Sequence, residues 1–283
     1  MKKVLVTTAL LSSYLLANSE ISTYYTYKDY DNSKTKTEGK TLDYRFLHNF
    51  QNSELTINYE DSLTKRENEL TKIKMTSLEI EKLSMKYLYH ISNDISIKTS
   101  FINIEDNLAP SDNGKIYGLG FIKSINNSNE IKIDTYLSNY DDFNVNQYDL
   151  TFVKKFKFND INFMGQTGIK YIDINGSEYG NYNLKNNYYT SYFLNLNANY
   201  NGFIFGLGFM NGDRLFAVLE DGLKVEHHAL EQNKTYVVSL GKKFKNIDLI
   251  SRYIYSNSNE LPENRKDVKS QFVSLGLKYK FSL

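Results

Sequence analysis

The sequence has 283 residues, and its 34 Lys and Arg nearly balance its 33 Asp and Glu, giving a formal net charge of +1. It contains 24 Tyr and 17 Phe but no Cys, no Trp and only two Pro. The lack of Cys excludes disulfide bonds, thiolate metal sites and a lipid anchor on Cys. The near-neutral charge disfavours a nucleic-acid partner, which would need a basic surface.

Residues 1–17 have the pattern of a cleaved secretory signal peptide. Lys2 and Lys3 supply a positive start, residues 4–16 form a short apolar stretch, and Ala17 is a plausible cleavage point. The apolar stretch is too short to span a bilayer. Its removal takes away two lysines and no acids, which leaves 32 basic against 33 acidic residues, a net charge of −1. We expect residues 18–283 to form a single domain.

Beyond residue 17, apolar residues recur mainly with a period of two, which is the pattern of β-strands with one apolar face. No later run of about 18 apolar residues occurs, so transmembrane helices are excluded. The alternation predicts fourteen strands, at residues 21–30, 41–48, 54–62, 79–91, 95–104, 115–125, 130–140, 147–156, 161–173, 187–198, 203–210, 234–244, 247–256 and 269–281.

The connections between these strands alternate in length. After every even-numbered strand the link is a short cluster of Asn, Asp, Ser or Gly, as at residues 199–202, which suits a hairpin turn. After odd-numbered strands the link is usually longer and polar, and both Pro110 and Pro262 lie in these links. Short turns at one end and long loops at the other are typical of outer-membrane barrels. The sequence therefore predicts an all-β fold, a closed antiparallel transmembrane β-barrel of about fourteen strands, with twelve and sixteen as alternatives.

Aromatic residues repeat at the turn end of the even-numbered strands, on their apolar face. A soluble core rich in Phe and Tyr is the alternative, but such a core would not confine its aromatics to one end of alternate strands. An aromatic girdle at the boundary between lipid and water explains the pattern. The predicted girdle consists of Phe46, Tyr89, Phe121, Phe156, Tyr200, Phe244 and Phe281.

The opposite faces of the strands carry charged residues and predict a polar lumen. Twelve basic and five acidic residues occupy these inward positions, an excess of seven positive charges. Rings of charge set the selectivity of a pore, so we expect a mild preference for anions, which an acidic loop would reduce. The predicted pore-lining charges are Arg45, Lys86, Lys98, Lys132, Asp134, Asp149, Lys155, Lys170, Arg252 and Lys278.

The longest connection, residues 211–234, is more apolar than an exposed loop needs to be. Leu215, Val218 and Leu219 lie at helical spacing, so a short surface helix is one interpretation. The other is a segment that folds into or over the pore as a constriction or gate. Histidines titrate near neutral pH and would then shift this segment with pH. The residues of the candidate gating loop are Glu220, Asp221, Glu226, His227 and His228.

The chain ends in VSLGLKYKFSL, in which Val273, Leu275, Leu277, Tyr279 and Phe281 alternate with small or charged residues. With this strand and its architecture, the chain resembles bacterial outer-membrane porins, and by length and strand count the monomeric fourteen-stranded OmpG-type channels. The resemblance implies insertion into outer-membrane lipid by the barrel-assembly machinery, which reads the last strand. The two residues after Phe281 displace the aromatic residue from the very end, which departs from that pattern.

These patterns predict a channel in the outer membrane of a diderm bacterium that passes small hydrophilic solutes or ions by diffusion, without catalysis, metal or cofactor. One alternative is a non-conducting barrel whose outer loops bind ligands or surfaces. Its lumen would be filled by large inward residues such as Tyr24, Ile102, Tyr136 and Phe193. The other is a barrel-embedded hydrolase, which needs a clustered Ser/His or Asp/His set that the sequence does not offer.

Overall fold

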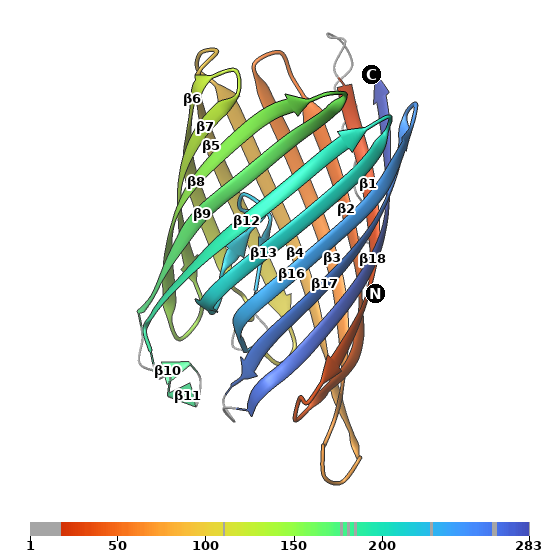
Figure 1. The fold of residues 1–283 in the computed structure, drawn as a ribbon. Coiled ribbons are helices and arrows are strands. Elements are labelled where there is room, and N and C mark those ends of the chain that lie inside the picture. Colours follow the sequence, from red (N-terminus) through yellow and green to blue (C-terminus); the bar gives the residue numbers. More distant parts are fainter. Residues whose placement is uncertain are drawn as a thin grey trace.

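A computed structural model describes residues 18–109, 111–175, 178–179, 182–183, 186–226, 229–261 and 265–282. The predicted signal peptide, Pro110 and Pro262 lie outside the described residues. Among the described residues, no helix is long and apolar enough to cross a membrane. The described residues form a closed barrel of fourteen strands (Figure 1): β1 (Asn18–Asp31), β2 (Lys36–Asn49), β3 (Ser53–Glu67), β4 (Lys74–His90), β5 (Ile95–Asp106), β6 (Lys115–Asn126), β7 (Asn129–Asn139), β8 (Asn144–Phe158), β9 (Ile161–Asn175), β12 (Tyr188–Tyr200), β13 (Phe203–Arg214), β16 (Leu230–Phe244), β17 (Ile247–Glu260) and β18 (Arg265–Ser282).

Each strand pairs antiparallel with its two neighbours, and β1 pairs with both β2 and β18, which closes the ladder. In the closing pair Tyr25 lies opposite Leu275, so the apolar face of the last strand continues onto the first. Closure leaves no unpaired strand edge in the barrel wall, which a β-structure in lipid requires. The prediction of an all-β, fourteen-stranded antiparallel barrel is confirmed.

The predicted strands overlap the observed ones one to one, but β3 and β4 are longer than predicted. They remain paired as far as Glu67 and Lys74, so this hairpin continues past the barrel rim (Figure 1). Beyond the membrane both faces of a strand are wet, and the apolar alternation that marks a strand in the sequence is lost. Two further short hairpins are not part of the barrel wall: β10 (Glu178–Tyr179) with β11 (Tyr182–Asn183), and β14 (Val218–Leu219) with β15 (Lys224–Val225).

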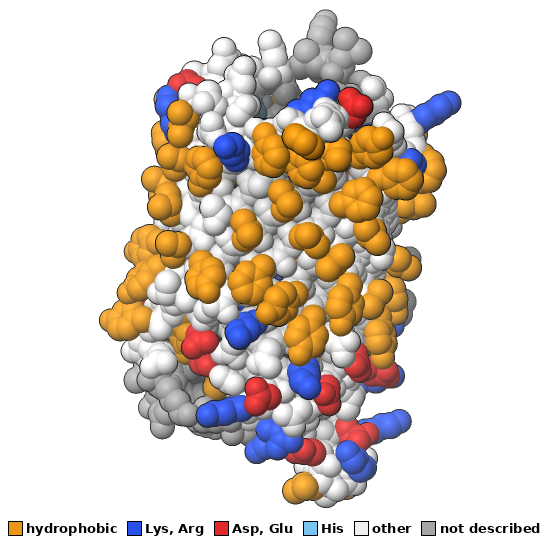
Figure 2. Space-filling view, in the orientation of Figure 1, with side chains coloured by type: hydrophobic (Ala, Val, Ile, Leu, Met, Phe, Trp, Pro, Cys, Tyr) orange, Lys and Arg blue, Asp and Glu red, His pale blue; other side chains and the backbone are white. Residues whose placement is uncertain are grey.

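The outer face of the barrel is a broad apolar band (Figure 2). Leu275, Leu277 and their counterparts on the other strands point outward and are exposed. The alternate residues of the same strands, such as Ser22 and Asn58, point inward and are buried. This arrangement is the reverse of a soluble barrel, and a bilayer is the solvent that it fits.

The short turns follow from local sequence. In the turn between β12 and β13, Asn201 and Gly202 have φ angles of 48° and 77°, in the left-handed region. Asn and Gly are the residues that adopt this conformation most readily, and consecutive residues there match the twist of an antiparallel hairpin. Such turns fix the register of the strands that follow.

The interior is polar only in part, which corrects the expectation of a wholly polar lumen. Towards the loop end, inward apolar residues of seven neighbouring strands form a buried cluster with the segment that joins β13 to β16. The reason is that this segment enters the barrel and needs an apolar surface to pack on. The cluster consists of Leu78, Ile80, Ile102, Ile104, Ile116, Tyr136, Tyr140, Phe143, Val145, Ile172, Ile174, Tyr189, Leu215, Phe216, Ala217, Val218 and Val225.

Candidate functional site

The long connection between β13 and β16 folds into the barrel as a small β-hairpin. Val218 pairs with Val225 and Leu219 with Lys224, and the residues between them form the tip. We call residues 215–226 the lumen hairpin. The interpretation of this stretch as a surface helix is wrong, because it forms a β-hairpin that lies inside the barrel.

Apolar packing explains why this connection is so hydrophobic. Leu215, Phe216 and Val218 are almost completely buried in the cluster inside the barrel. The ring of Phe216 lies 5.3 Å from that of Tyr140 and 4.9 Å from that of Phe143, centre to centre. Burying aromatic and aliphatic side chains of this size stabilises the base of the hairpin by a few kcal/mol.

Side chains of the wall also bind the backbone of the lumen hairpin. Gln147, on β8, accepts a hydrogen bond from Val218 N at 2.7 Å and donates one to Val218 O at 2.9 Å, as a neighbouring strand would. Lys170, on β9, donates to the same carbonyl at 3.1 Å. On the other arm, the Ser84 hydroxyl donates to Leu223 O at 2.9 Å. These bonds satisfy backbone groups that would otherwise be buried without partners.

The tip carries two acids, and each has one oxygen bound by a base of the wall. Arg45 Nη2 lies 2.7 Å from Glu220 Oε2, and Lys98 Nζ lies 3.1 Å from Asp221 Oδ1. Burial alone would raise the pKa of Glu220, but the charge of Lys224, followed by that of Arg45, lowers it to about 2. In the same way Lys98 and its basic neighbours outweigh burial and hold the pKa of Asp221 below its ordinary value. Both acids are therefore ionised at neutral pH.

The tip approaches the wall closely enough to require glycine. Glu220, Asp221 and Gly222 all have left-handed φ angles, of 49°, 56° and 88°. A Cβ atom on Gly222 would collide with Ser100 on β5. Two non-glycine residues in this conformation store backbone strain, which the contacts on either side of the tip hold in place.

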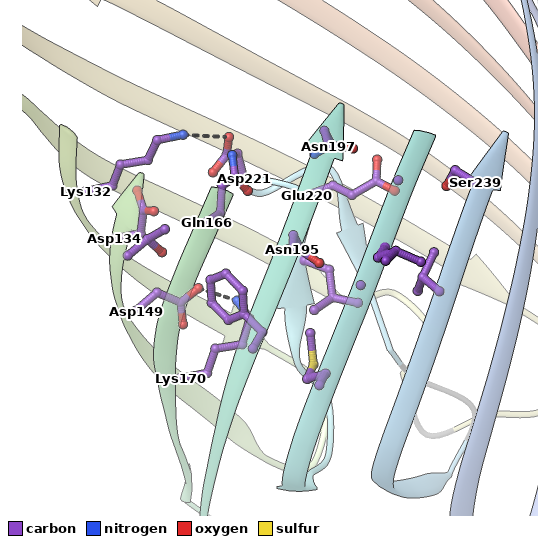
Figure 3. A pocket seen from close by; sticks show the side chains of 18 of the residues that line it. Lys132, Asp134, Asp149, Gln166, Lys170, Asn195, Asn197, Glu220, Asp221 and Ser239 are labelled. Carbon is purple, nitrogen blue, oxygen red and sulfur yellow. Dashed lines mark hydrogen bonds and ion pairs between the residues drawn. The ribbon is translucent and has the colours of Figure 1, made fainter. Parts of the chain in front are cut away.

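A cavity of about 350 Å³ remains between the lumen hairpin and the far wall. Figure 3 shows Glu220 and Asp221 reaching into it, with Lys132 and Asp134 on one side and Asn195, Asn197 and Ser239 on the other. The outer wall of the cavity is formed by strands β7 to β17, and two of its inward positions are Gly206 and Gly208. Charged groups therefore lie on the hairpin, on β7 to β9 and at Arg252 of β17, whereas the wall from β12 to β16 contributes only neutral side chains to the cavity.

Comparisons with known proteins support the architecture. No protein-family model matches the sequence, and a search of curated proteins finds no match. A solved structure described as a bacterial polysaccharide outer membrane secretin superposes with a TM-score of 0.57, at 9% identity, over 93% of this chain and 98% of that one. OccK8 (OprE) of Pseudomonas aeruginosa matches with a TM-score of 0.46, at 11% identity, over 94% of this chain and 98% of that one. At 9% identity the first match shows a similar fold and nothing about function. The second match, with a TM-score of 0.46, adds no further information about the fold.

The described residues combine a closed strand ladder, an apolar outer band and a partly polar interior with a cavity, as membrane-spanning β-barrels do. The fold is that of a bacterial outer-membrane β-barrel. Its apolar outer band fits a surrounding lipid bilayer. Both ends of the described chain lie at the short-turn end, where Asn18 is paired with Ser282.

The barrel brings most of the predicted pore-lining charges into ion pairs. Lys98 with Asp134 and Lys170 with Asp149 are nearly buried pairs at 2.8 and 2.5 Å. Other predicted residues bind the tip of the lumen hairpin or lie nearer the short turns. Arg45, Lys132 and Arg252 face the tip, Lys155 pairs with Glu130, Lys278 pairs with Glu20, and Lys86 is half-buried without an ion pair among the described residues.

The inward acids were undercounted from the sequence. Glu20 pairs with Lys278, and Glu260 lies 2.7 Å from Lys36 at the loop end of the barrel. Both acids share the inward parity of their strands, so the same two-residue period could have found them. With these acids and the hairpin acids included, the positive excess in the lumen is smaller than seven.

Six of the seven predicted girdle residues lie near the short-turn end of their strands, and Phe121 lies at the middle of β6. Tyr89, Phe121, Phe156, Tyr200 and Phe244 are exposed on the outer face, while Phe46 and Phe281 are half-buried. The ring of Phe156 stacks on that of Phe163 in the next strand, with centres 5.0 Å apart. Their role at the membrane boundary remains a prediction.

The four histidines lie away from the cavity or outside the described residues. His48 Nδ1 lies 2.8 Å from Ser19 Oγ, and His90 Nδ1 lies 2.9 Å from Ser96 Oγ, both near the short turns. Neither imidazole contacts a carboxylate among the described residues, so neither pair is oriented as a nucleophile and base would be. His227 and His228 are outside the described residues, whereas Glu226 pairs with Arg214 at 3.0 Å. In the part of the chain that the structure describes, no group of three or more His, Asp or Glu could hold a metal ion.

Proposed function

We propose that the barrel is a channel through which small hydrophilic solutes or ions diffuse across the outer membrane, with the lumen hairpin as its constriction. The observation that carries this proposal is the polar cavity that remains beside the docked hairpin. A barrel built only as a scaffold for outer loops would have no need of charged and amide side chains around an internal space. The channel needs no bound cofactor, since pore width and lumen charge are enough to select solutes.

In this channel the lumen hairpin acts as a fixed wall. Its base is packed in an apolar cluster and its backbone is bound by Gln147 and Ser84. Solutes then pass along the opposite side of the lumen, between Glu220 and Asp221 of the tip and the wall of β9 to β17. The proposed gating by His227 and His228 would have to act on the stretch that leaves the hairpin towards β16.

The channel has a mild preference for anions in this proposal. Most bases near the hairpin are neutralised by ion pairs, so they contribute little net field. Lys86 and Lys243 point inward towards the short-turn end, and neither has an ion-pair partner among the described residues. Their unpaired charge, together with the remaining basic excess, favours anions in the periplasmic half of the lumen, and salt screens the effect.

The test is the single-channel conductance of residues 18–283, refolded in detergent and added to a planar bilayer under a KCl gradient. We expect stable steps on the order of 0.1–1 nS and a reversal potential of the sign that anion preference gives. A reversal potential of the opposite sign would overturn the preference but leave the pore. A heat-modifiable, folded barrel that never conducts would overturn the channel itself.

A non-conducting outcome would favour the alternative of a barrel that presents its outer loops. One observation speaks for that alternative: Ile102, Tyr136 and Phe193 are buried inside the barrel, as a filled lumen requires. The hydrolase alternative has no such support, because neither described Ser–His contact has an acid partner. We also propose that the barrel-assembly machinery recognises β18 during insertion.

A further inference from the structure

We propose that the cavity beside the lumen hairpin binds zwitterionic solutes, small molecules such as α-amino acids that carry an ammonium and a carboxylate group. The binding groups are two loose ion pairs, Lys132 with Asp221 and Arg252 with Glu220. This inference rests on the proposed channel function and assigns it a class of solute.

The ion pairs around the hairpin fall into two groups. On the docked side each charged group of the hairpin has one pair of hydrogen-bond length with the wall, as Lys224 has with Asp43 at 2.5 Å, and Lys224 also lies 4.0 Å from Glu60 and from Glu220 Oε1. The two pairs that face the cavity are longer, and in both the nitrogen and oxygen lie 3.7 Å apart. That separation exceeds a hydrogen bond, so the facing atoms attract each other but remain able to bind another group.

Each hairpin acid is anchored by one oxygen and presents the other. Asp221 binds Lys98 through Oδ1 and faces Lys132 with Oδ2. Glu220 binds Arg45 through Oε2 and faces Arg252 with Oε1. The acid side chains are 41% and 34% exposed, so the free oxygens are accessible from the cavity. The anchoring pairs hold these oxygens in fixed positions without using them.

A zwitterion can exchange with a loose pair without leaving a charge unpaired. Its ammonium group binds the free carboxylate oxygen, and its carboxylate binds the facing Lys or Arg, so both protein charges keep a partner. A simple anion binds the base but leaves the second oxygen of the acid without its facing counter-charge, and a simple cation binds the acid but leaves the base without its partner. Leaving a partly buried charge unpaired is unfavourable, so the loose pairs discriminate in favour of solutes that carry both charges.

The far wall supplies neutral groups for the rest of the solute. Gln166 lies directly across the strands from Asn195, and Asn197 is the next inward residue along β12. Within the described part of the chain, none of these three amides is hydrogen-bonded to another side chain or to the backbone. The cavity, at about 350 Å³, lies at the lower end of the size range of small-molecule sites, which fits amino acids and short peptides.

The experiment compares two isomers, alanine and lactamide, in a swelling assay. They share one molecular formula, but at neutral pH alanine is a zwitterion and lactamide is uncharged. Liposomes that contain the folded full-length barrel are diluted into isosmotic solutions of either solute, and the initial swelling rates are compared. A weak site raises the solute concentration at the narrowest point, so we expect alanine to enter about twofold faster or more.

Two double variants keep the net charge and each remove one loose pair together with the anchoring pair of its acid: Lys132→Met with Asp221→Asn, and Arg252→Met with Glu220→Gln. We expect the ratio of alanine to lactamide rates to fall towards one in both. The matched control is Lys123→Met with Asp94→Asn, which removes a pair of the same types at a short turn outside the lumen. Heat modifiability on a gel shows which variants have folded, and either loose-pair variant alone is enough for the test.

The outcomes separate this inference from the channel proposal. Equal entry of alanine and lactamide into wild-type proteoliposomes, both faster than into empty liposomes, overturns the site and leaves the channel. An alanine advantage that persists in the loose-pair variants also overturns the site. No entry of either solute overturns the proposed channel function instead. An alanine advantage that is lost in these variants but kept in the control supports the site.

Discussion

The two sides of the lumen hairpin differ in how their charges are held. On the docked side Glu220, Asp221 and Lys224 each have a partner in the wall at 2.7, 3.1 and 2.5 Å. The backbone is bound there at Val218 and Leu223. On the open side, Lys132 of β7 and Arg252 of β17 each lie 3.7 Å from one of the acids, and the amides of the wall between them are without partners in the described structure. The same two acids, Glu220 and Asp221, take part in both sides.

The difference shows how a narrow passage can carry charges at fixed positions. A charged side chain on a mobile loop would collapse onto the nearest counter-charge. Here the bases that hold Glu220 and Asp221 in place lie behind them, and only the second oxygen of each faces the cavity. Burying the docked charges is costly, and short, hydrogen-bonded geometry is what offsets that cost.

Replacing residues 216–226 by a short Gly and Ser linker should have the largest effect on conductance, because it removes both sides of the lumen hairpin at once. The barrel ladder does not depend on these residues, so it should still close, and removal of the hairpin widens the passage. We expect single-channel conductance to rise by roughly twofold or more. The control shortens the tip of the β3–β4 hairpin at residues 68–73, which projects away from the lumen and should leave conductance unchanged. An unchanged conductance after loss of the lumen hairpin would show that it is not the constriction.

Gln147→Ala should loosen the docked side alone. It removes both bonds to Val218 and leaves that residue's N–H and C=O buried without this partner, at a cost of about 1–3 kcal/mol. We expect larger current fluctuations in single-channel recordings and faster protease cleavage of the hairpin. The matched control is Gln166→Ala on the open side, where the amide has no protein partner in the described structure, and which should change neither reading. Equal behaviour of the two variants would contradict the role of Gln147.

Of the three changes, acidification from pH 8 to pH 4 should have the smallest effect on the channel. The pKa of Glu220 is lowered to about 2 and that of Asp221 is also lowered, so both stay ionised as pH falls from 8 towards 4. A lowered pKa in the folded state stabilises docking above the ordinary pKa of the acid, and that contribution disappears as pH falls through the lowered value. We expect selectivity, measured as reversal potential, to stay constant down to about pH 4 and to change only below it. A transition between pH 5 and 7 would instead support the predicted role of His227 and His228.

The wall of the barrel could be predicted from the sequence because its signal is local. A strand that meets lipid on one side must alternate, and residues such as Val273, Leu275 and Leu277 show the alternation within a few positions. The short turns could be predicted equally well, because residues such as Asn201 and Gly202 favour the left-handed φ angles that a tight hairpin needs. The strand segments that the sequence did not predict lie beyond the lipid, where residues no longer need to alternate between apolar and polar. The extension of β3 to Glu67 is an example.

The site could be predicted only in outline. The apolar content of residues 211–234 indicated a segment with something to pack on, and it does pack inside the barrel. The partners could not be predicted, because Glu220 meets Arg45 across 175 positions of the chain and Asp221 meets Lys98 across 123. The helical spacing of Leu215 and Val218 was misleading, since the buried face of this stretch is set by the wall that it touches.

At the end of β13 the chain leaves the barrel wall through an irregular stretch and turns into the lumen. This irregular stretch is useful for engineering. The register of β13 against β16 shifts between Asn211 and Arg214, and Gly212 there has a φ of 104°. Arg214 is buried and binds Thr235 of the next strand at 2.6 Å. The direction in which the chain turns is therefore encoded in the wall, before the hairpin begins. A foreign loop grafted after Arg214 should inherit that direction, which makes this barrel a frame for peptides displayed inside a pore.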